Sequence, residues 1–118
     1  GSTALQVAAV FDRTEIALLL IENGADIEVK KNDGATALHV AAFFGRLELV
    51  KALLEKGADK TVKTNEGATA LDSVSSSFEE VRPVYEFLEG LLAPVGFKLD
   101  YDLLQENRPK IAEMLRAE

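Results

Sequence analysis

Two stretches decide the fold: ENGADIEVKKNDGATAL at residues 22–38 and EKGADKTVKTNEGATAL at residues 55–71. They align without a gap at an interval of 33 residues, which pairs Gly24 with Gly57. The tripeptide TAL keeps the same interval and begins at Thr3, Thr36 and Thr69. Self-similarity at a fixed interval is the mark of stacked structural repeats. The sequence therefore predicts a chain built from units of 33 residues.

Each unit predicts two helices joined by a polar break. A threonine caps a short helix that contains paired alanines, and a longer apolar helix follows and ends at a glycine. The longer helices carry apolar residues at the spacing i, i+3, i+4 that marks one buried face. These residues are Ile16, Leu19 and Leu20 in the first unit and Leu49, Ala52 and Leu53 in the second. Gly24 and Gly57 are expected in the left-handed backbone region, which glycine reaches at little cost.

These features resemble the ankyrin repeat family. Residues 34–59 carry most of the family pattern: a glycine turn, a TALH segment, paired alanines, a glycine and a closing GAD. The likeness extends over residues 1–72, although each unit has alanine where the family usually has proline, and the histidine position holds Gln6, His39 and Asp72. The resemblance implies an all-α fold, an ankyrin-type α-solenoid of stacked helix-turn-helix repeats with short finger turns.

The third unit departs from this pattern. Ser75 and Phe78 stand where alanine and glycine are expected, and Val84, Phe87 and Leu88 match the second-helix spacing only if two residues are inserted. The same spacing returns at Ile111, Met114 and Leu115. We therefore predict a degenerate fourth unit that forms a C-terminal helical cap, with Asp100 capping its first helix and Pro109 opening its second.

The length of 118 residues and the hydrophobic content of 47% suit one compact domain. The expected division of residues 1–118 is repeat 1 at 1–33, repeat 2 at 34–66, a divergent repeat 3 at 67–98 and a degenerate capping repeat at 99–118.

Composition argues against several function classes. The net charge of −7 opposes the phosphates of nucleic acids and of anionic lipids, so neither a nucleic acid nor a membrane is expected as a partner. No apolar run approaches the ~20 residues that cross a bilayer. With no cysteine and one histidine, we expect no metal site and no cofactor, and the cytoplasm is the expected location.

No catalytic group of residues is apparent, so the chain is not expected to be an enzyme. The serines at 73–77 lie far along the sequence from His39, the only histidine. Within the TALH segment, the imidazole of His39 is expected to satisfy Thr36 and backbone groups between repeats, because buried polar groups need partners.

Phe43 and Phe44 raise the question of a binding surface. Adjacent helical residues diverge by about 100°, so one buried stripe does not easily cover both rings. In the ankyrin family these two positions lie on the concave side and commonly touch partners, and their counterparts one unit earlier are Val10 and Phe11. The predicted partner-binding residues combine this apolar strip with finger residues: Val10, Phe11, Lys30, Asn32, Asp33, Phe43, Phe44, Lys63, Asn65 and Glu66. The alternative for Phe44 is packing against Phe11 and the next repeat.

Two functions follow. The first is a non-catalytic protein-protein interaction module, a passive scaffold whose concave face and fingers bind another protein. The second is an assembly element that forms a homodimer through repeat 1, where Leu18 and Ile21 replace the Lys51 and Leu54 of repeat 2. Terminal repeats normally carry a polar outer face, so this apolar one indicates either that upstream repeats have been removed or that another copy covers it.

Overall fold

The computed structural model describes residues 4–75 and 77–116. The elements are α1 (Ala4–Val10), α2 (Thr14–Glu22), α3 (Ala37–Phe43), α4 (Leu47–Glu55), α5 (Asp72–Ser75), α6 (Phe78–Leu92), the 3-10 helix η1 (Ala93–Val95) and α7 (Tyr101–Arg116). These described residues contain no strand, as expected for an ankyrin-type solenoid. The predicted cap residue Thr3 lies outside the described residues.

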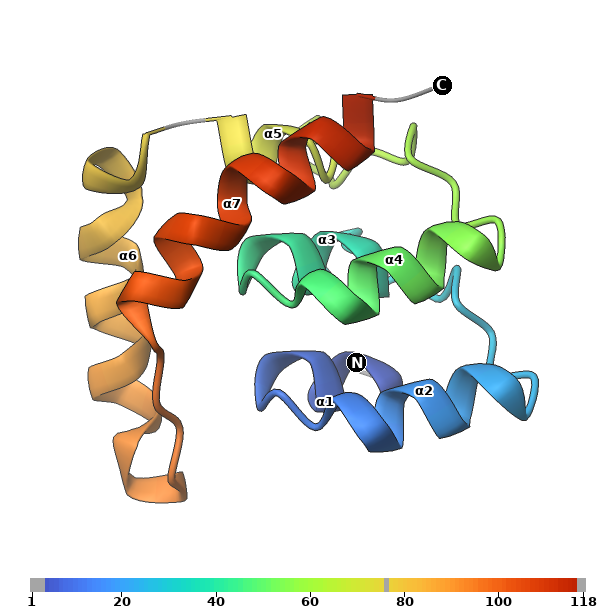
Figure 1. The fold of residues 1–118 in the computed structure, drawn as a ribbon, viewed down its shortest axis with the longest axis horizontal. Helices are drawn as coiled ribbons and strands as arrows, with labels where there is room; N and C mark the ends of the chain where they lie inside the picture. The colour runs from blue at the N-terminus through green and yellow to red at the C-terminus, as the bar shows by residue number, and fades with distance from the viewer. Residues whose placement is uncertain (1–3, 76, 117–118) are drawn as a thin grey trace.

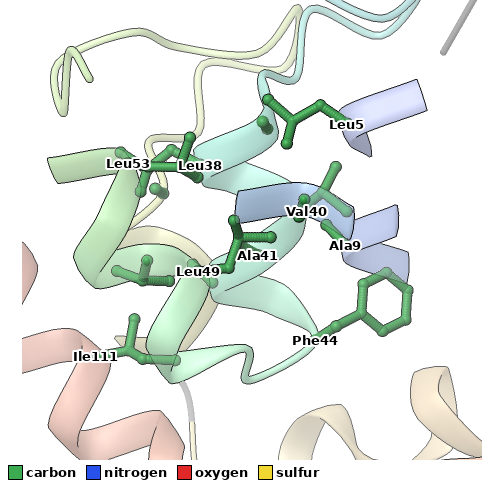
Figure 2. Close-up of a cluster of buried hydrophobic side chains, with 14 of the residues drawn as sticks. Leu5, Ala9, Leu38, Val40, Ala41, Phe44, Leu49, Leu53 and Ile111 are labelled. Carbon is green, nitrogen blue, oxygen red and sulfur yellow. The ribbon is translucent and has the colours of Figure 1, made fainter. Parts of the chain in front are cut away.

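Repeats 1 and 2 are two helix pairs stacked in register, α1 with α2 and α3 with α4 (Figure 1). Ala9, Ala41 and Ala42 are completely buried, and such small side chains allow neighbouring helices to approach closely. Figure 2 shows Leu38, Leu49 and Leu53 gathered in the core of this stack. The predicted buried stripe of the second helix is confirmed in repeat 2 at Leu49 and Leu53, which are 1% and 0% exposed. In repeat 1 the same prediction is wrong at Ile16 and Leu19, which are 54% and 58% exposed, because no described helix covers that side of α2.

The turn inside each pair uses a left-handed residue, Asp12 with φ of 57° in repeat 1 and Gly45 with φ of 69° in repeat 2. The amide of Arg46 then donates to the carbonyl of Ala41 and closes the turn. In repeat 3 the equivalent position holds Phe78, a bulky residue that the left-handed region disfavours. The chain does not turn back there but continues into α6, which stands across the ends of the repeats (Figure 1).

After α6 the chain returns as α7, which packs against α4 and α5. Ile111, Ala112 and Leu115 are buried in the same pattern as residues 49, 50 and 53 of α4. We infer that α7 occupies the place of the second helix of repeat 3, with residues 76–100 inserted before it. The unit boundaries given above otherwise stay a prediction.

Two expectations for the C-terminal half are wrong. Val84 and Phe87, which the spacing placed on a buried stripe, are 46% and 67% exposed, because α6 does not join the stack. Pro109 does not open a helix but lies inside α7, which is continuous from Tyr101 to Arg116. The expectation for Asp100 is confirmed, since its Oδ1 accepts from the amide of Leu103 at 3.1 Å and caps α7.

Among the described residues, no helix combines the length and apolar character that crossing a membrane requires.

The second finger packs on the first at Gly34. A Cβ at Gly34 would lie 2.9 Å from the amide nitrogen of Asn65, whereas a Cβ at Gly57 would meet no atom within 4 Å. Both glycines are left-handed, with φ of 86° and 87°. Gly57 thus takes the left-handed conformation predicted for it, and only Gly34 also has a steric restriction.

Gly57→Ala should lower the free energy of unfolding by about 1–2 kcal/mol, the cost of a Cβ in the left-handed region. Gly34→Ala should cost more, because it also pushes Asn65 away from its partners on the first finger. Urea unfolding of the two variants measures the difference. Equal costs would mean that the fingers separate freely.

Candidate functional site

A mostly apolar groove combines both stacked repeats with the insertion. Its apolar lining comes from α1 and α3 and from Leu88 and Leu92 of α6, and its polar lining from the two fingers, defined as residues 24–35 and 57–68. The lining residues are Val10, Lys31, Asp33, Ala35, His39, Val40, Phe43, Phe44, Thr64, Ser73, Leu88 and Leu92.

The predicted apolar strip is only partly open. Phe44 is 9% exposed, and Phe11 and Phe43 are half-buried. Phe97, which follows η1, packs its ring edge-on against Phe11 and Phe44 at 5.7 Å from each. The alternative of packing for Phe44 therefore describes its environment better than partner contact. Val10 and Phe43 still line the groove.

Tyr85 holds α6 onto the stack and is completely buried. Its ring lies 4.7 Å from that of Phe43. Its hydroxyl donates to the carbonyl of Phe43 and accepts from Nη1 of Arg108 at 2.8 Å. Burial raises the pKa of Tyr85, and nearby Arg108 opposes this shift. Hydrogen bonds through the Tyr85 hydroxyl therefore link α3, α6 and α7 beneath the groove.

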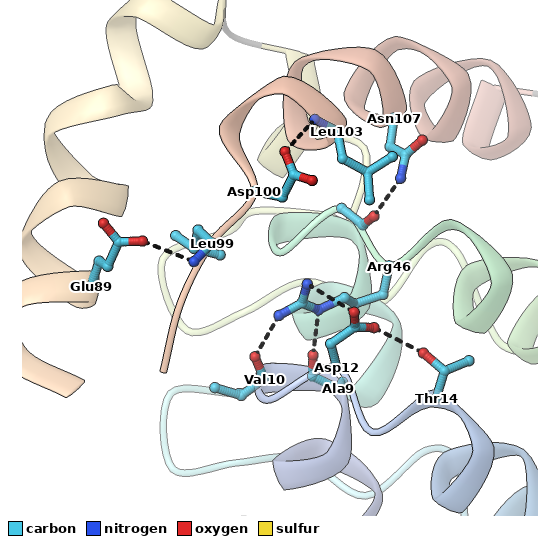
Figure 3. Close-up of polar contacts among 11 residues, drawn as sticks. Ala9, Val10, Asp12, Thr14, Arg46, Glu89, Leu99, Asp100, Leu103 and Asn107 are labelled. Atoms are coloured by element: carbon cyan, nitrogen blue, oxygen red, sulfur yellow. Dashed lines mark hydrogen bonds and ion pairs between the residues drawn. The ribbon is translucent and has the colours of Figure 1, made fainter. Parts of the chain in front are cut away.

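Arg46 performs the corresponding task between repeats 1 and 2. Its guanidinium donates to the carbonyls of Ala9 at 2.9 Å and Val10 at 2.7 Å, and it lies 3.9 Å from the carboxylate of Asp12 (Figure 3). Burial lowers the pKa of Arg46, and Asp12 opposes the shift. Arg46 thus supplies donors to carbonyls at the end of α1. These bonds hold Val10, which lines the groove, in place against repeat 2.

Two further hydrogen bonds in Figure 3 hold the start and end of this part of the chain in place. Glu89 accepts from the amide of Leu99 at 2.8 Å, and Asn107 donates to the carbonyl of Gly45 at 3.0 Å (Figure 3). These two contacts fix where the chain leaves α6 and where α7 meets repeat 2.

The predicted finger residues are exposed, but three of them also hold the two fingers together. The amide of Asn65 donates to the carbonyl of Asp33 at 2.8 Å, and its side chain donates to the carbonyl of Asn32 at 2.9 Å. The exposed predicted positions of the fingers are Lys30, Asn32, Asp33, Lys63, Asn65 and Glu66. Asp33 alone among these six lines the groove.

Residues that the prediction omitted are Lys31 and Thr64 of the fingers and Leu88 and Leu92 of α6. Lys31 and Thr64 lie between the finger residues that were predicted to bind. Which of these neighbours faces the groove depends on the backbone conformation of the finger, which the sequence pattern does not give. Leu88 and Leu92 were detectable as an i, i+4 apolar pair, although nothing in their spacing says what they face.

His39 is committed to structure, as expected. Its Nδ1 lies 3.0 Å from the hydroxyl of Thr36 and accepts from the Thr36 amide at 3.1 Å, and its Nε2 lies 3.1 Å from the carbonyl of Ala68 on the next finger. Gln6 makes the analogous link one repeat earlier, to the carbonyl of Val29 at 2.9 Å. In the part of the chain that the structure describes, no cluster of three acidic, histidine or cysteine side chains is placed to hold a metal.

Comparison with known proteins gives one match. The model of the family described as ankyrin repeats (3 copies) matches residues 1–64. The matched residues contain the helix pairs α1–α2 and α3–α4 and most of the second finger, and they end before α5. A search of curated proteins finds no match to the chain.

Tyr85→Phe should lower the free energy of unfolding by about 1–3 kcal/mol at neutral pH, because it leaves the buried carbonyl of Phe43 without its donor. Chemical denaturation measures the loss. An unchanged stability would mean that water takes the place of the hydroxyl.

The same pair of proteins should differ in pH dependence. Burial raises the pKa of the Tyr85 hydroxyl above its ordinary value of 10.0 in the folded wild type. As the pH rises, the unfolded chain therefore loses this proton at a lower pH than the folded chain does. The contribution of Tyr85 to stability is therefore complete below about pH 10 and is lost as the pH rises through the folded-state pKa. The stability difference between wild type and Tyr85→Phe should narrow above pH 10, and a constant difference would contradict the assignment.

Proposed function

Because this chain belongs to the ankyrin repeat family, whose repeats are generally protein-protein interaction modules, we propose that it is a non-catalytic module that binds another protein in its groove. The observation that carries the proposal is the groove itself, with an apolar floor and polar finger residues beside it. An apolar patch rimmed by polar groups is typical of an interaction site.

The contact surface we propose is narrower than the predicted strip. Val10 and the open side of Phe43 supply apolar contact, and Lys31, Asp33 and Thr64 supply polar contact from the fingers. The exposed fingertip residues Lys30, Asn32, Lys63, Asn65 and Glu66 flank this surface. Phe11 and Phe44 support the floor, because Phe97 packs against both.

Two further features support a binding rather than a catalytic role. His39 uses both ring nitrogens in contacts that hold the repeats together, so it is occupied as a structural group. The charge of −7 favours a protein partner over a nucleic acid. With no cysteine to form disulfides, the proposed location is the cytoplasm.

Lys31→Glu tests the groove, with Lys51→Glu as a matched control on the opposite side of repeat 2. Both lysines lie away from the buried core, and the side chain of Lys51 is 51% exposed. A protein captured by the wild type and then purified should bind Lys31→Glu about tenfold or more weakly, and Lys51→Glu as well as the wild type, in a calorimetric titration. Equal losses would place the interface elsewhere.

A second candidate function, self-association, is favoured by the outer face of repeat 1. Val7, Ile16 and Leu19 are 47%, 54% and 58% exposed. Leu49, the counterpart of Ile16 in repeat 2, is 1% exposed. In a linear stack these positions meet the preceding repeat. The same face on a second copy would cover them in a symmetric dimer.

Ile16→Glu should leave the fold intact, because Ile16 is exposed, and should abolish any dimer by placing a charge in its apolar centre. Sedimentation velocity over a range of concentrations measures the change. A wild-type chain that is monomeric throughout this range would contradict self-association without affecting the groove proposal.

A further inference from the structure

The insertion leaves a second apolar surface, on the side of α6 that faces away from Tyr85. Val84, Phe87 and Leu91 follow the spacing i, i+3, i+7 and are 46%, 67% and 62% exposed. They therefore form one continuous stripe over two turns of helix. Large side chains in such a row rarely stay in water without a function. We call Val84, Phe87, Gly90 and Leu91 the outer face of α6.

Gly90 gives an independent reason to expect contact on this side. It lies three residues after Phe87, inside the helix, where glycine is the least favourable residue after proline. Outside its chain neighbours and the backbone of its own helix, no atom of the described chain lies within 4 Å of where its Cβ would be. Packing within the chain thus does not require a glycine there. A missing side chain beside a projecting phenylalanine permits another backbone to approach closely.

The charges of α6 indicate what kind of partner fits. The helix contains Glu79, Glu80, Glu86 and Glu89 and only one cation, Arg82. Arg82 is already paired, 4.0 Å from Glu79 and 3.6 Å from Glu86. A second copy of α6 would bring acidic residues against acidic residues, and an anionic membrane would be repelled. A basic partner protein avoids both kinds of repulsion and is attracted by the acidic residues of α6.

We propose that the outer face of α6 is a docking surface for a basic amphipathic helix of a partner protein. The apolar stripe of that helix packs along Val84, Phe87 and Leu91. Its backbone approaches at Gly90, and its lysines or arginines lie beside Glu80. Recognition of one helix by apolar anchors at i, i+3 and i+7 is a common mode of association. This surface is separate from the groove, which is lined by Leu88 and Leu92 of the same helix.

The test uses the whole chain and a synthetic peptide about 18 residues long, with leucines at i, i+4 and i+7 and lysines on both flanks. A matched peptide has glutamate in place of every lysine. Fluorescence anisotropy should show binding of the lysine peptide, weakening as salt is added, and at least tenfold weaker binding of the glutamate peptide. Equal binding of both peptides, or of neither, would overturn the proposal.

Variants of the chain locate the contact. Phe87→Glu should weaken binding of the lysine peptide at least tenfold, and Leu91→Ala provides a milder second variant of an exposed residue. Gly90→Ala should raise the melting temperature, because alanine favours helix, and yet weaken binding by closing the approach. Binding that is unchanged by Phe87→Glu or by Gly90→Ala would overturn the proposal.

Lys31→Glu in the groove should leave peptide binding unchanged, so failure here and failure of the groove proposal are distinguishable. Two other occupants give different results. A wild-type dimer that Phe87→Glu dissociates in sedimentation would assign the surface to a second copy. Binding to phosphatidylserine vesicles that Phe87→Glu removes would assign it to a membrane. Either result would overturn the proposal.

Discussion

Helices of seven and nine residues are too short to persist alone in water, so burial between neighbouring repeats is the constraint on which this structure depends. Each pair must present its apolar positions to the pair beside it at the same height. The interval of 33 residues provides this register, and the buried alanines set the spacing between helices. Ile16 lacks such cover, since it is exposed whereas its counterpart Leu49 is buried.

The insertion gives this chain features that stacked repeats alone do not have. Tyr85 and Phe97 reach from it into the stack, so its inner side completes the groove that the repeats begin. Arg108 of α7 meets the hydroxyl of Tyr85 from the other side. The frame and the insertion thus stabilise each other, while the outer side of α6 is left open to solvent.

The sequence predicted the repeating part of the fold well and the insertion poorly. Register, helix pairs and the role of His39 follow from local signals that recur, and repetition makes each signal more certain. Phe78 in place of glycine showed where the pattern stops. It did not show where the chain goes, because the apolar spacing of Val84 and Phe87 is compatible with both a buried and an exposed stripe. Phe97 covers part of the predicted binding strip, at Phe11 and Phe44, and it lies too far along the chain from both for a local pattern to reveal this.

The split third repeat has a consequence for how the protein folds. Contacts within and between the first two repeats join residues close in sequence, whereas α7 meets α4 only after a long segment has closed into a loop. Loop closure opposes folding by an entropy that grows only with the logarithm of loop length, so a few residues more or fewer change it little. Because local contacts form before non-local ones, we expect the N-terminal repeats to fold first and α7 to dock last. The segment between α5 and α7 can therefore change in length at little entropic cost, provided that Tyr85 and Phe97 still reach the stack.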